Sequence, residues 1–150
     1  MLCGLPGSGK STFTREFQGP VVSTDAIREM VTGDAANRSR DSLVFKLAQE
    51  MLAYYLFRNI SVMYDATNLL RSSRRRIIAL GRRYNARIRV IWIDCPPELA
   101  IRRNLQRKRQ VPAHVIRRMH RQFQPPSPEE GIAVIERREV CDTPDTPPSQ

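Results

Sequence analysis

The segment Gly4–Ser11 has the spacing of a phosphate-binding loop. Its sequence, GLPGSGKS, contains a glycine, four further residues and then Gly-Lys-Ser. Glycines let the backbone turn tightly, so that successive N–H groups can point toward phosphate oxygens. A helix that begins at Lys10 would direct the positive end of its dipole to the same place. We therefore predict a nucleoside triphosphate site here, because a predicted strand before the loop and a predicted helix after it make a chance match in a flexible turn the weaker interpretation.

Two side chains of this loop have specific expected tasks. Lys10 can reach the β- and γ-phosphates, and the hydroxyl of Ser11 can bind Mg²⁺. The donor is expected to be ATP. The residues predicted to contact it in this segment are Gly4, Pro6, Gly7, Ser8, Gly9, Lys10, Ser11 and Thr12.

Two aspartates follow predicted strands and are candidates for a catalytic base. Asp25 comes at the end of one strand, in VVSTDAIR, and Asp65 at the end of the next, in VMYDATN. Ligands of α/β sheets gather at the carboxyl ends of the strands, where a carboxylate can accept a proton from an attacking hydroxyl. Asp25 could instead cap the following helix, and Asp65 could form an Asx-type turn with Asn68. Together with the phosphate loop, the catalytic interpretation is favoured.

Arg28 follows Asp25 by one helical turn, so the two side chains project from the same face of the predicted helix. A fixed cation beside the presumed base would suit a phosphate group on the acceptor. The alternative is a surface arginine that pairs with Asp25 or Glu29.

The segment Arg71–Arg121 is strongly basic, with sixteen arginines and lysines against two acidic residues. Arg103 and Arg107 lie four residues apart, so they share a face of the predicted helix Pro97–Lys108. The far end of this helix could fold over the nucleotide as a lid and neutralise phosphate charge during transfer. A solvated helix surface, along which nucleic acid could lie, is the expectation for Arg74, Arg75, Arg76, Arg82 and Arg83.

Composition limits the kind of protein that this chain can be. Its 150 residues suit one domain, and 41% apolar residues suffice for a normal core. A net charge of +10 is unusual for an enzyme of small neutral metabolites and favours polyanions such as nucleic acid, although part of it could be ordinary solvated surface. The three scattered cysteines fit a reducing compartment, and no apolar run is long enough for a membrane helix. We therefore expect a cytoplasmic protein without membrane contact.

The elements that must position these residues alternate between short apolar and longer amphipathic segments, which predicts a three-layer α/β fold with a parallel sheet. The expected strands are Met1–Cys3, Pro20–Thr24, Ile60–Ala66, Ile88–Asp94 and Ile132–Glu136. The expected helices are Lys10–Gln18, Asp25–Thr32, Arg40–Arg58, Ser72–Tyr84, Pro97–Lys108 and Pro112–Phe123. The first strand is short, which suggests that the chain starts at a domain edge, trimmed or cut from a longer polypeptide. Residues 139–150 are expected to be a flexible, proline-rich tail.

Four segments, in this order and spacing, resemble the 5′-polynucleotide kinase family of P-loop phosphotransferases, and especially the kinase modules of bacterial end-healing and RNA-repair enzymes. They are GLPGSGKST, STDAIR, YDATN and RRNLQRKRQVPAHVIRRM. The likeness runs from Leu2 to about Arg138 and implies a P-loop kinase domain over residues 1–138. It further implies a parallel five-stranded sheet of order 2-3-1-4-5 and a helical, arginine-rich lid.

The resemblance also implies a role for each candidate residue. Asp25 would be the general base that takes the proton from a 5′-hydroxyl, and Arg28 would hold the neighbouring 3′-phosphate of the acceptor. The acceptor pocket would be organised by Asp65, Thr67 and Asn68. The lid cations on the nucleotide would be Arg103, Arg107 and Arg109.

The leading hypothesis is an ATP-dependent, Mg²⁺-dependent kinase that phosphorylates the 5′-OH ends of RNA or DNA, as one part of a larger multidomain repair enzyme. A second hypothesis is a P-loop kinase for a small acceptor, such as a nucleoside, a sugar, an antibiotic or a UDP-sugar. A third is a nucleotide-binding switch module with little turnover. The acid–arginine pair Asp25 and Arg28 argues against the third, because a switch has little need of it.

Overall fold

The computed structural model describes residues 1–141. These residues form five strands, six α-helices and one short 3₁₀ helix. In chain order they are β1 (Leu2–Cys3), α1 (Lys10–Glu16), β2 (Val21–Ser23), α2 (Thr24–Thr32), α3 (Asp41–Phe57), β3 (Met63–Asp65), α4 (Arg71–Arg83), β4 (Arg89–Asp94), α5 (Pro97–Leu105), α6 (Ala113–Arg121), η1 (Pro128–Glu130) and β5 (Val134–Glu139). The proline-rich tail expected at the end of the chain falls mostly in residues 142–150, outside the described residues.

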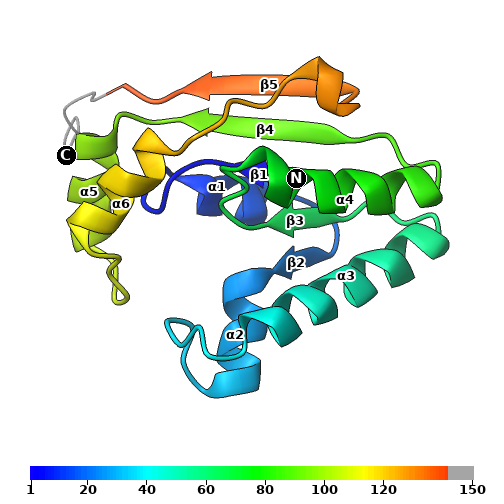
Figure 1. The fold of residues 1–150 in the computed structure, drawn as a ribbon, viewed down its shortest axis with the longest axis horizontal. Helices are drawn as coiled ribbons and strands as arrows, with labels where there is room; N and C mark the ends of the chain where they lie inside the picture. Colours follow the sequence, from blue (N-terminus) through cyan, green and yellow to red (C-terminus); the bar gives the residue numbers. More distant parts are fainter. Residues whose placement is uncertain (142–150) are drawn as a thin grey trace, which may run out of the picture.

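All strand pairs are parallel, as expected, and the strands lie in the order β5, β4, β1, β3, β2 from top to bottom of Figure 1. Hydrogen-bonded ladders join β1, β4 and β5 in one group and β2 and β3 in another. Between β3 and β1 the described residues form no ladder. The junction is instead made by the Gly4 N–H, which donates to the Thr67 carbonyl at 3.0 Å, and by the Asn68 amide, which donates to the Leu2 carbonyl at 2.6 Å. The ladders thus confirm two parts of the predicted order: β2 lies beside β3, and β4 lies between β1 and β5.

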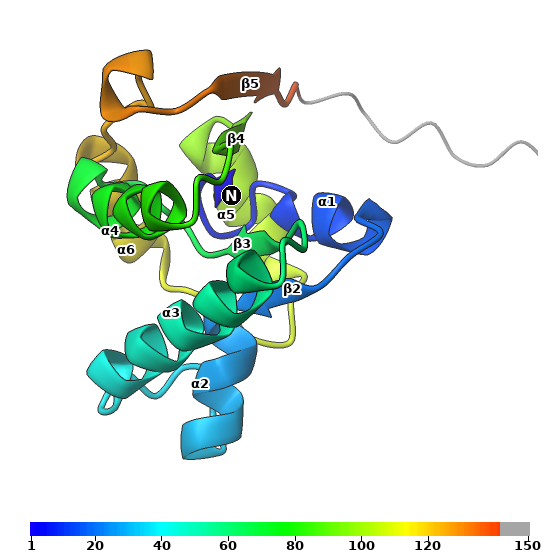
Figure 2. The same cartoon turned by 90° about the vertical axis from the view of Figure 1, so that its right-hand side faces the viewer.

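Helices cover both faces of the strands. Figure 2 shows α1 on one side and α3 and α4 on the other, which is the expected three-layer arrangement. One apolar cluster packs α2 and α3 against β2 and β3, with Val22, Ile27, Val44 and Leu52 at its centre. Another joins the phosphate loop to α5 and α6 through residues that include Leu5, Leu99 and Ile116. The loop and the helices that follow β4 therefore share one apolar cluster, and α2 and α3 pack on a second one.

Three boundaries, the end of α5, the start of β3 and the end of β5, differ from the sequence expectation by three residues, and the others differ by less. α5 ends at Leu105 because the side chain of Asn104 bonds both backbone groups of Val111, accepting from its N–H at 3.0 Å and donating to its carbonyl at 2.8 Å. These two hydrogen bonds close the loop between Asn104 and Val111, where the sequence predicted that the helix would continue. β3 begins three residues later than expected, and β5 is shifted to pair with all of β4.

The expectation of a solvated side chain is wrong for Arg74. Its guanidinium is fully buried, donates to both carboxylate oxygens of Glu130 at 2.9 and 2.7 Å, and also bonds the carbonyls of Asn68, Leu69 and Pro125. The reason is its position on α4, which faces the loop that follows β3.

No helix in residues 1–141 is long and apolar enough to cross a membrane.

Candidate active site

A cavity of about 1420 Å³ collects most of the predicted site residues. It lies at the carboxyl ends of β1, β2 and β3, between the phosphate loop, the start of α2 and the loop that follows α5. Predicted site residues on its wall are Pro6, Gly7, Gly9, Lys10, Ser11, Asp25, Arg28, Asp65, Thr67, Asn68, Arg103, Arg107 and Arg109. Gly4, Ser8 and Thr12 were also expected to touch the nucleotide, but they do not line this cavity.

The phosphate loop is held in a tight, curved conformation. Gly9 precedes α1 with φ 102°, and Gly7 has φ 81°, both in the left-handed region that favours glycine. At Gly7 a Cβ would also lie 2.2 Å from the Ala100 carbonyl oxygen, so a side chain there would collide with α5. Ser8 is fully buried, and its hydroxyl has no hydrogen-bond partner in the described part of the chain.

Lys10 bends back over the loop, where its ammonium donates to the carbonyls of Gly4 at 2.8 Å and Leu5 at 2.7 Å. The residue as a whole is partly exposed, but the ammonium itself is withdrawn from water. This desolvation lowers the pKa of Lys10 to about 8, with the charge of Asp65 opposing the shift. A cation in this state gains from a nearby anion, so the residue fits a triphosphate.

A bound Mg²⁺ would need oxygen ligands from the phosphates and a few side chains. Among residues 1–141 no cluster of three or more His, Cys, Asp or Glu side chains could hold a metal on its own. Ser11 opens onto the cavity at the first turn of α1, and its hydroxyl is the group in the loop that fits this task.

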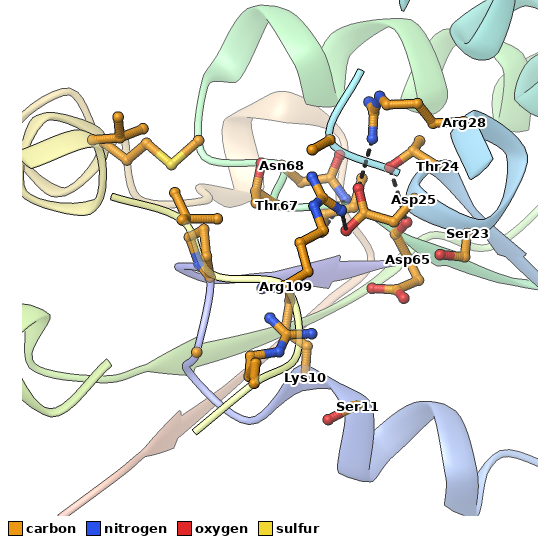
Figure 3. Close-up of a pocket in the computed structure, with 18 of the residues that line it drawn as sticks. Lys10, Ser11, Ser23, Thr24, Asp25, Arg28, Asp65, Thr67, Asn68 and Arg109 are labelled. Atoms are coloured by element: carbon orange, nitrogen blue, oxygen red, sulfur yellow. Dashed lines mark hydrogen bonds and ion pairs between the residues drawn. The ribbon is translucent and has the colours of Figure 1, made fainter. Parts of the chain in front are cut away.

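Asp25 stands in the first turn of α2 and projects into the cavity, as Figure 3 shows. The cap of this helix is Ser23, whose hydroxyl accepts from the Ala26 N–H at 3.5 Å, so Asp25 is not needed as a cap. The carboxylate is 57% exposed and bonds two arginines: Arg28 at 2.6 Å through one oxygen and Arg109 at 3.0 Å through the other. A carboxylate that is partly exposed to the cavity and held by two arginines can accept a proton from a ligand there.

Arg28 is only 2% exposed and lies between two carboxylates. Its Nη1 donates to Asp25, and its Nε donates to Asp41 at 2.8 Å. The pairing with Asp25, which was the alternative interpretation of Arg28, is therefore confirmed, but the side chain is buried and not on the surface, and the cation positions Asp25. Asp41, at the start of α3, was not found from the sequence because thirteen residues separate it from Arg28 and no motif links them.

Asp65 faces Lys10 from the end of β3. Burial raises the pKa of Asp65, while the charge of Lys10 and a hydrogen bond with Ser23 act against this rise. Asn68 is buried in a left-handed conformation with φ 49°, and its amide donates to the carbonyls of Leu2 at 2.6 Å and Ala66 at 3.4 Å. The side chain of Asn68 thus links β1 to the loop after β3, on which Thr67 lines the cavity.

The loop between α5 and α6 closes the cavity from the opposite side. Arg103 is on α5, whereas Arg107 and Arg109 come after its end and reach the cavity from the loop. The charge of Arg107 lowers the pKa of Lys10, so Arg107 is close to the phosphate loop. Figure 3 shows Arg109 extending toward Asp25. The predicted lid cations are therefore gathered on one side of the site.

Comparisons with known proteins agree with this geometry. The AAA domain family matches the chain over residues 1–126. The L-seryl-tRNA(Sec) kinase of Methanococcus maripaludis is 27% identical over 135 residues, which cover 84% of this chain and 52% of that protein. The Homo sapiens L-seryl-tRNA(Sec) kinase is 30% identical over 95 residues, covering 59% of this chain and 27% of that protein. The chain thus spans about half, or less, of the length of these curated relatives.

Solved structures give the same fold. A chain of the Pnkp1/Rnl/Hen1 RNA repair complex superposes with a TM-score of 0.72 at 27% identity, covering 81% of this chain and 42% of that one. A gluconokinase from Sinorhizobium meliloti 1021 superposes with a TM-score of 0.58 at 15% identity, covering 95% of this chain and 82% of that one, a likeness of fold alone. The predicted resemblance to P-loop phosphotransferases of RNA repair is confirmed. Because the family match covers most of its residues, this chain belongs to the AAA domain family and forms a P-loop kinase domain.

Proposed function

We propose that this domain transfers the γ-phosphate of ATP to the 5′-hydroxyl end of RNA or DNA. The observation that carries the proposal is the placement of the Asp25 carboxylate and the Lys10 ammonium on the wall of one cavity. Phosphoryl transfer requires the phosphates to be held and an attacking hydroxyl to lose its proton nearby. Lys10 and Asp25 can divide these two tasks between them.

The transfer would use the residues as follows. The phosphate loop, Lys10 and the lid arginines would hold the triphosphate, and Ser11 would bind the Mg²⁺ that neutralises phosphate charge. The acceptor oxygen would bond to the γ-phosphorus as the bond to the β-phosphate oxygen breaks. The hydroxyl proton would pass to Asp25, and lengthening of one of its two arginine bonds would make the carboxylate a better base. Since Arg28 is buried and also fixed by Asp41, the partly exposed partner Arg109 is the one expected to move.

A nucleic-acid acceptor is supported by the charge of the cavity. Cations on its wall include Arg38, Arg76, Arg102, Arg103, Arg107, Lys108, Arg109 and Arg118. One triphosphate needs only some of these, and a polymer end brings further phosphates that the others can bind. The similarity to a chain of an RNA repair complex supports the same acceptor class.

A second candidate acceptor is a seryl group carried by tRNA. It is favoured by the 27% identity to a protein whose name is L-seryl-tRNA(Sec) kinase, over 84% of this chain. Both candidates present a primary hydroxyl that is attached to RNA, so the same base and the same phosphate loop could serve either. They differ in whether the hydroxyl belongs to the terminal ribose or to an amino acid.

The test is label transfer from γ-labelled ATP to a panel of acceptors. The panel contains 5′-OH RNA and DNA oligonucleotides, the same oligonucleotides with a 5′-phosphate as matched controls, seryl-tRNA, and small hydroxyl compounds including nucleosides and sugars. We expect label on the 5′-OH oligonucleotides and none on the blocked controls. Labelled seryl-tRNA with unlabelled oligonucleotides would move the assignment to the second candidate, and label on a small compound alone would overturn both.

A further inference from the structure

The cavity continues beyond the donor residues to a wall formed by α4 and α6. From α4 it is lined by Ser73, Arg76 and Ile77, and from α6 by a second row of three residues, Val115, Arg118 and Met119. Both rows have the spacing i, i+3, i+4, so each row occupies one face of its helix. Each row therefore presents one arginine to the cavity beside apolar side chains.

The two rows are held in a fixed relation by the chain that follows α6. The Gln124 N–H donates to the Leu69 carbonyl at 3.0 Å, and the Gln124 side chain accepts from the Arg71 N–H at 2.8 Å. Arg74 adds a bond to the Pro125 carbonyl at 3.4 Å. The start of α4 is thus tied to the end of α6, and Figure 2 shows both helices on the same side of the strands.

Arg76 and Arg118 line the cavity and, unlike Arg74 and Arg117, have no carboxylate partner within residues 1–141. Arg74 is bound by Glu130, and Arg117, next to Arg118, is bound by Glu98 at 2.9 Å. Arg28, the cation first expected to bind the acceptor, already has two carboxylate partners. Arg76 and Arg118 are therefore exposed cations on the cavity wall whose charge is left for an anionic ligand.

We propose that Arg76 and Arg118 form a second phosphate subsite, which binds a backbone phosphodiester of the acceptor strand away from the reacting end. This inference deepens the proposed function and rests on it. A phosphodiester has two non-bridging oxygens that share one negative charge, so each oxygen can accept hydrogen bonds from one guanidinium. The apolar members of the rows, Ile77, Val115 and Met119, would contact the adjoining sugar or base. The subsite would favour an acceptor of two or more nucleotides over a mononucleotide.

The test compares the double variant Arg76→Gln/Arg118→Gln with the matched control Arg75→Gln/Arg121→Gln. The control arginines are exposed on the same two helices but do not line the cavity. Binding of a fluorescent 5′-OH hexanucleotide is measured by anisotropy over a range of salt concentrations. We expect the cavity variant to bind about tenfold more weakly, with a salt slope smaller by about 0.7, and the control to change less than about twofold. ATP affinity should be the same in all three proteins.

Equal loss in both double variants would show a nonspecific charge effect and would overturn the inference, as would unchanged binding in the cavity variant. Transfer is measured separately, with the hexanucleotide and with a nucleoside 3′-monophosphate as acceptors. The cavity variant should raise KM for the hexanucleotide about tenfold and leave KM for the monophosphate unchanged. If the wild-type protein phosphorylates neither acceptor, the proposed function fails, and the anisotropy result alone still decides whether the subsite exists.

Discussion

The guanidinium of Arg109 lies 3.0 Å from the carboxylate of Asp25, and this ion pair joins the loop after α5 to the first turn of α2. The loop carries cations expected on the nucleotide, and Asp25 is the expected base. In this arrangement the lid and the base neutralise each other across the mouth of the cavity. A triphosphate would compete with Asp25 for Arg109 and so release a carboxylate oxygen for the acceptor.

Arg109→Gln removes a cation that is expected to leave Asp25 and bind a phosphate oxygen when ATP binds. We expect the Kd for ATP to rise about three- to tenfold, because a partly exposed charge pair with phosphate contributes modestly. KM for the acceptor should change little. The measurement is calorimetric titration with ATP, with Arg121→Gln as the control, because Arg121 is exposed and does not line the cavity. An unchanged ATP affinity would assign Arg109 to Asp25 alone and remove it from the donor site.

Lys10 should take up a proton when ATP binds. Its pKa is about 8 in the free protein, against an ordinary value of 10.5, and phosphate oxygens would restore the charged form. At pH 8 about half a proton should therefore be bound per ATP, and ATP affinity should fall as the pH rises above 8. Over the same interval the free protein becomes more stable, because the unfolded chain still holds a proton that the folded chain has lost.

Calorimetry of ATP binding in buffers of different ionisation enthalpy measures this uptake. The Asp65→Asn variant tests whether Lys10 is the group that takes up this proton. The Asp65 charge raises the pKa of Lys10, so its removal should shift the uptake to lower pH. Binding enthalpies at pH 8 that do not depend on the buffer would contradict the assignment of the proton to Lys10.

The buried pair of Arg74 and Glu130 should dominate the stability of the loop after β3. Arg74 is 0% exposed and Glu130 3%, so removing one partner leaves an unpaired buried charge. We expect Glu130→Ala to lower the free energy of unfolding by about 3–5 kcal/mol in urea titrations. In the matched control, Glu98→Ala breaks the exposed pair with Arg117 and should leave the urea midpoint almost unchanged. Similar midpoints for both variants would show that the buried pair is not a stabilising clamp.

The pair of Arg74 and Glu130 should also make the free energy of unfolding depend on pH. Burial opposes ionisation of Glu130, but its hydrogen bonds with Arg74 and Ser127 outweigh this and lower its pKa. A lowered carboxyl pKa contributes stability above the unfolded value of 4.5, and this contribution is lost as the pH falls through the folded value. The wild-type protein should therefore lose more stability below pH 4.5 than Glu130→Gln does. Parallel stability curves of the two proteins on acidification would contradict this.

The parts of the site that the sequence predicted are those fixed by local spacing or by topology. The phosphate loop is a local pattern, and the strand ends that carry Asp25 and Asp65 meet at one edge because parallel strands end on the same side. Both aspartates and the loop indeed line one cavity. The parallel sheet followed from the alternation of strands and helices, whereas the order of its strands was implied by the family resemblance.

The features that sequence analysis missed depend on pairs of residues far apart in the chain. Glu130 comes 56 residues after Arg74, so the composition of α4 predicted a solvated row of arginines, whereas Arg74 is fully buried. The end of α5 is likewise set by Asn104, whose amide meets Val111 only after the chain has turned. Helix propensity favours continuation there, and tertiary hydrogen bonds override it.

The most direct test of the account is the rate of label transfer from γ-labelled ATP to a 5′-OH oligonucleotide by the wild-type protein and by Asp25→Asn. Removal of a positioned base should lower kcat by about a hundredfold or more, while the Kd for ATP stays within about twofold. Asp34→Asn is the control, because Asp34 is exposed and does not line the cavity. Transfer by Asp25→Asn at the wild-type rate would contradict the central claim that this carboxylate, opposite Lys10, accepts the proton of the attacking hydroxyl.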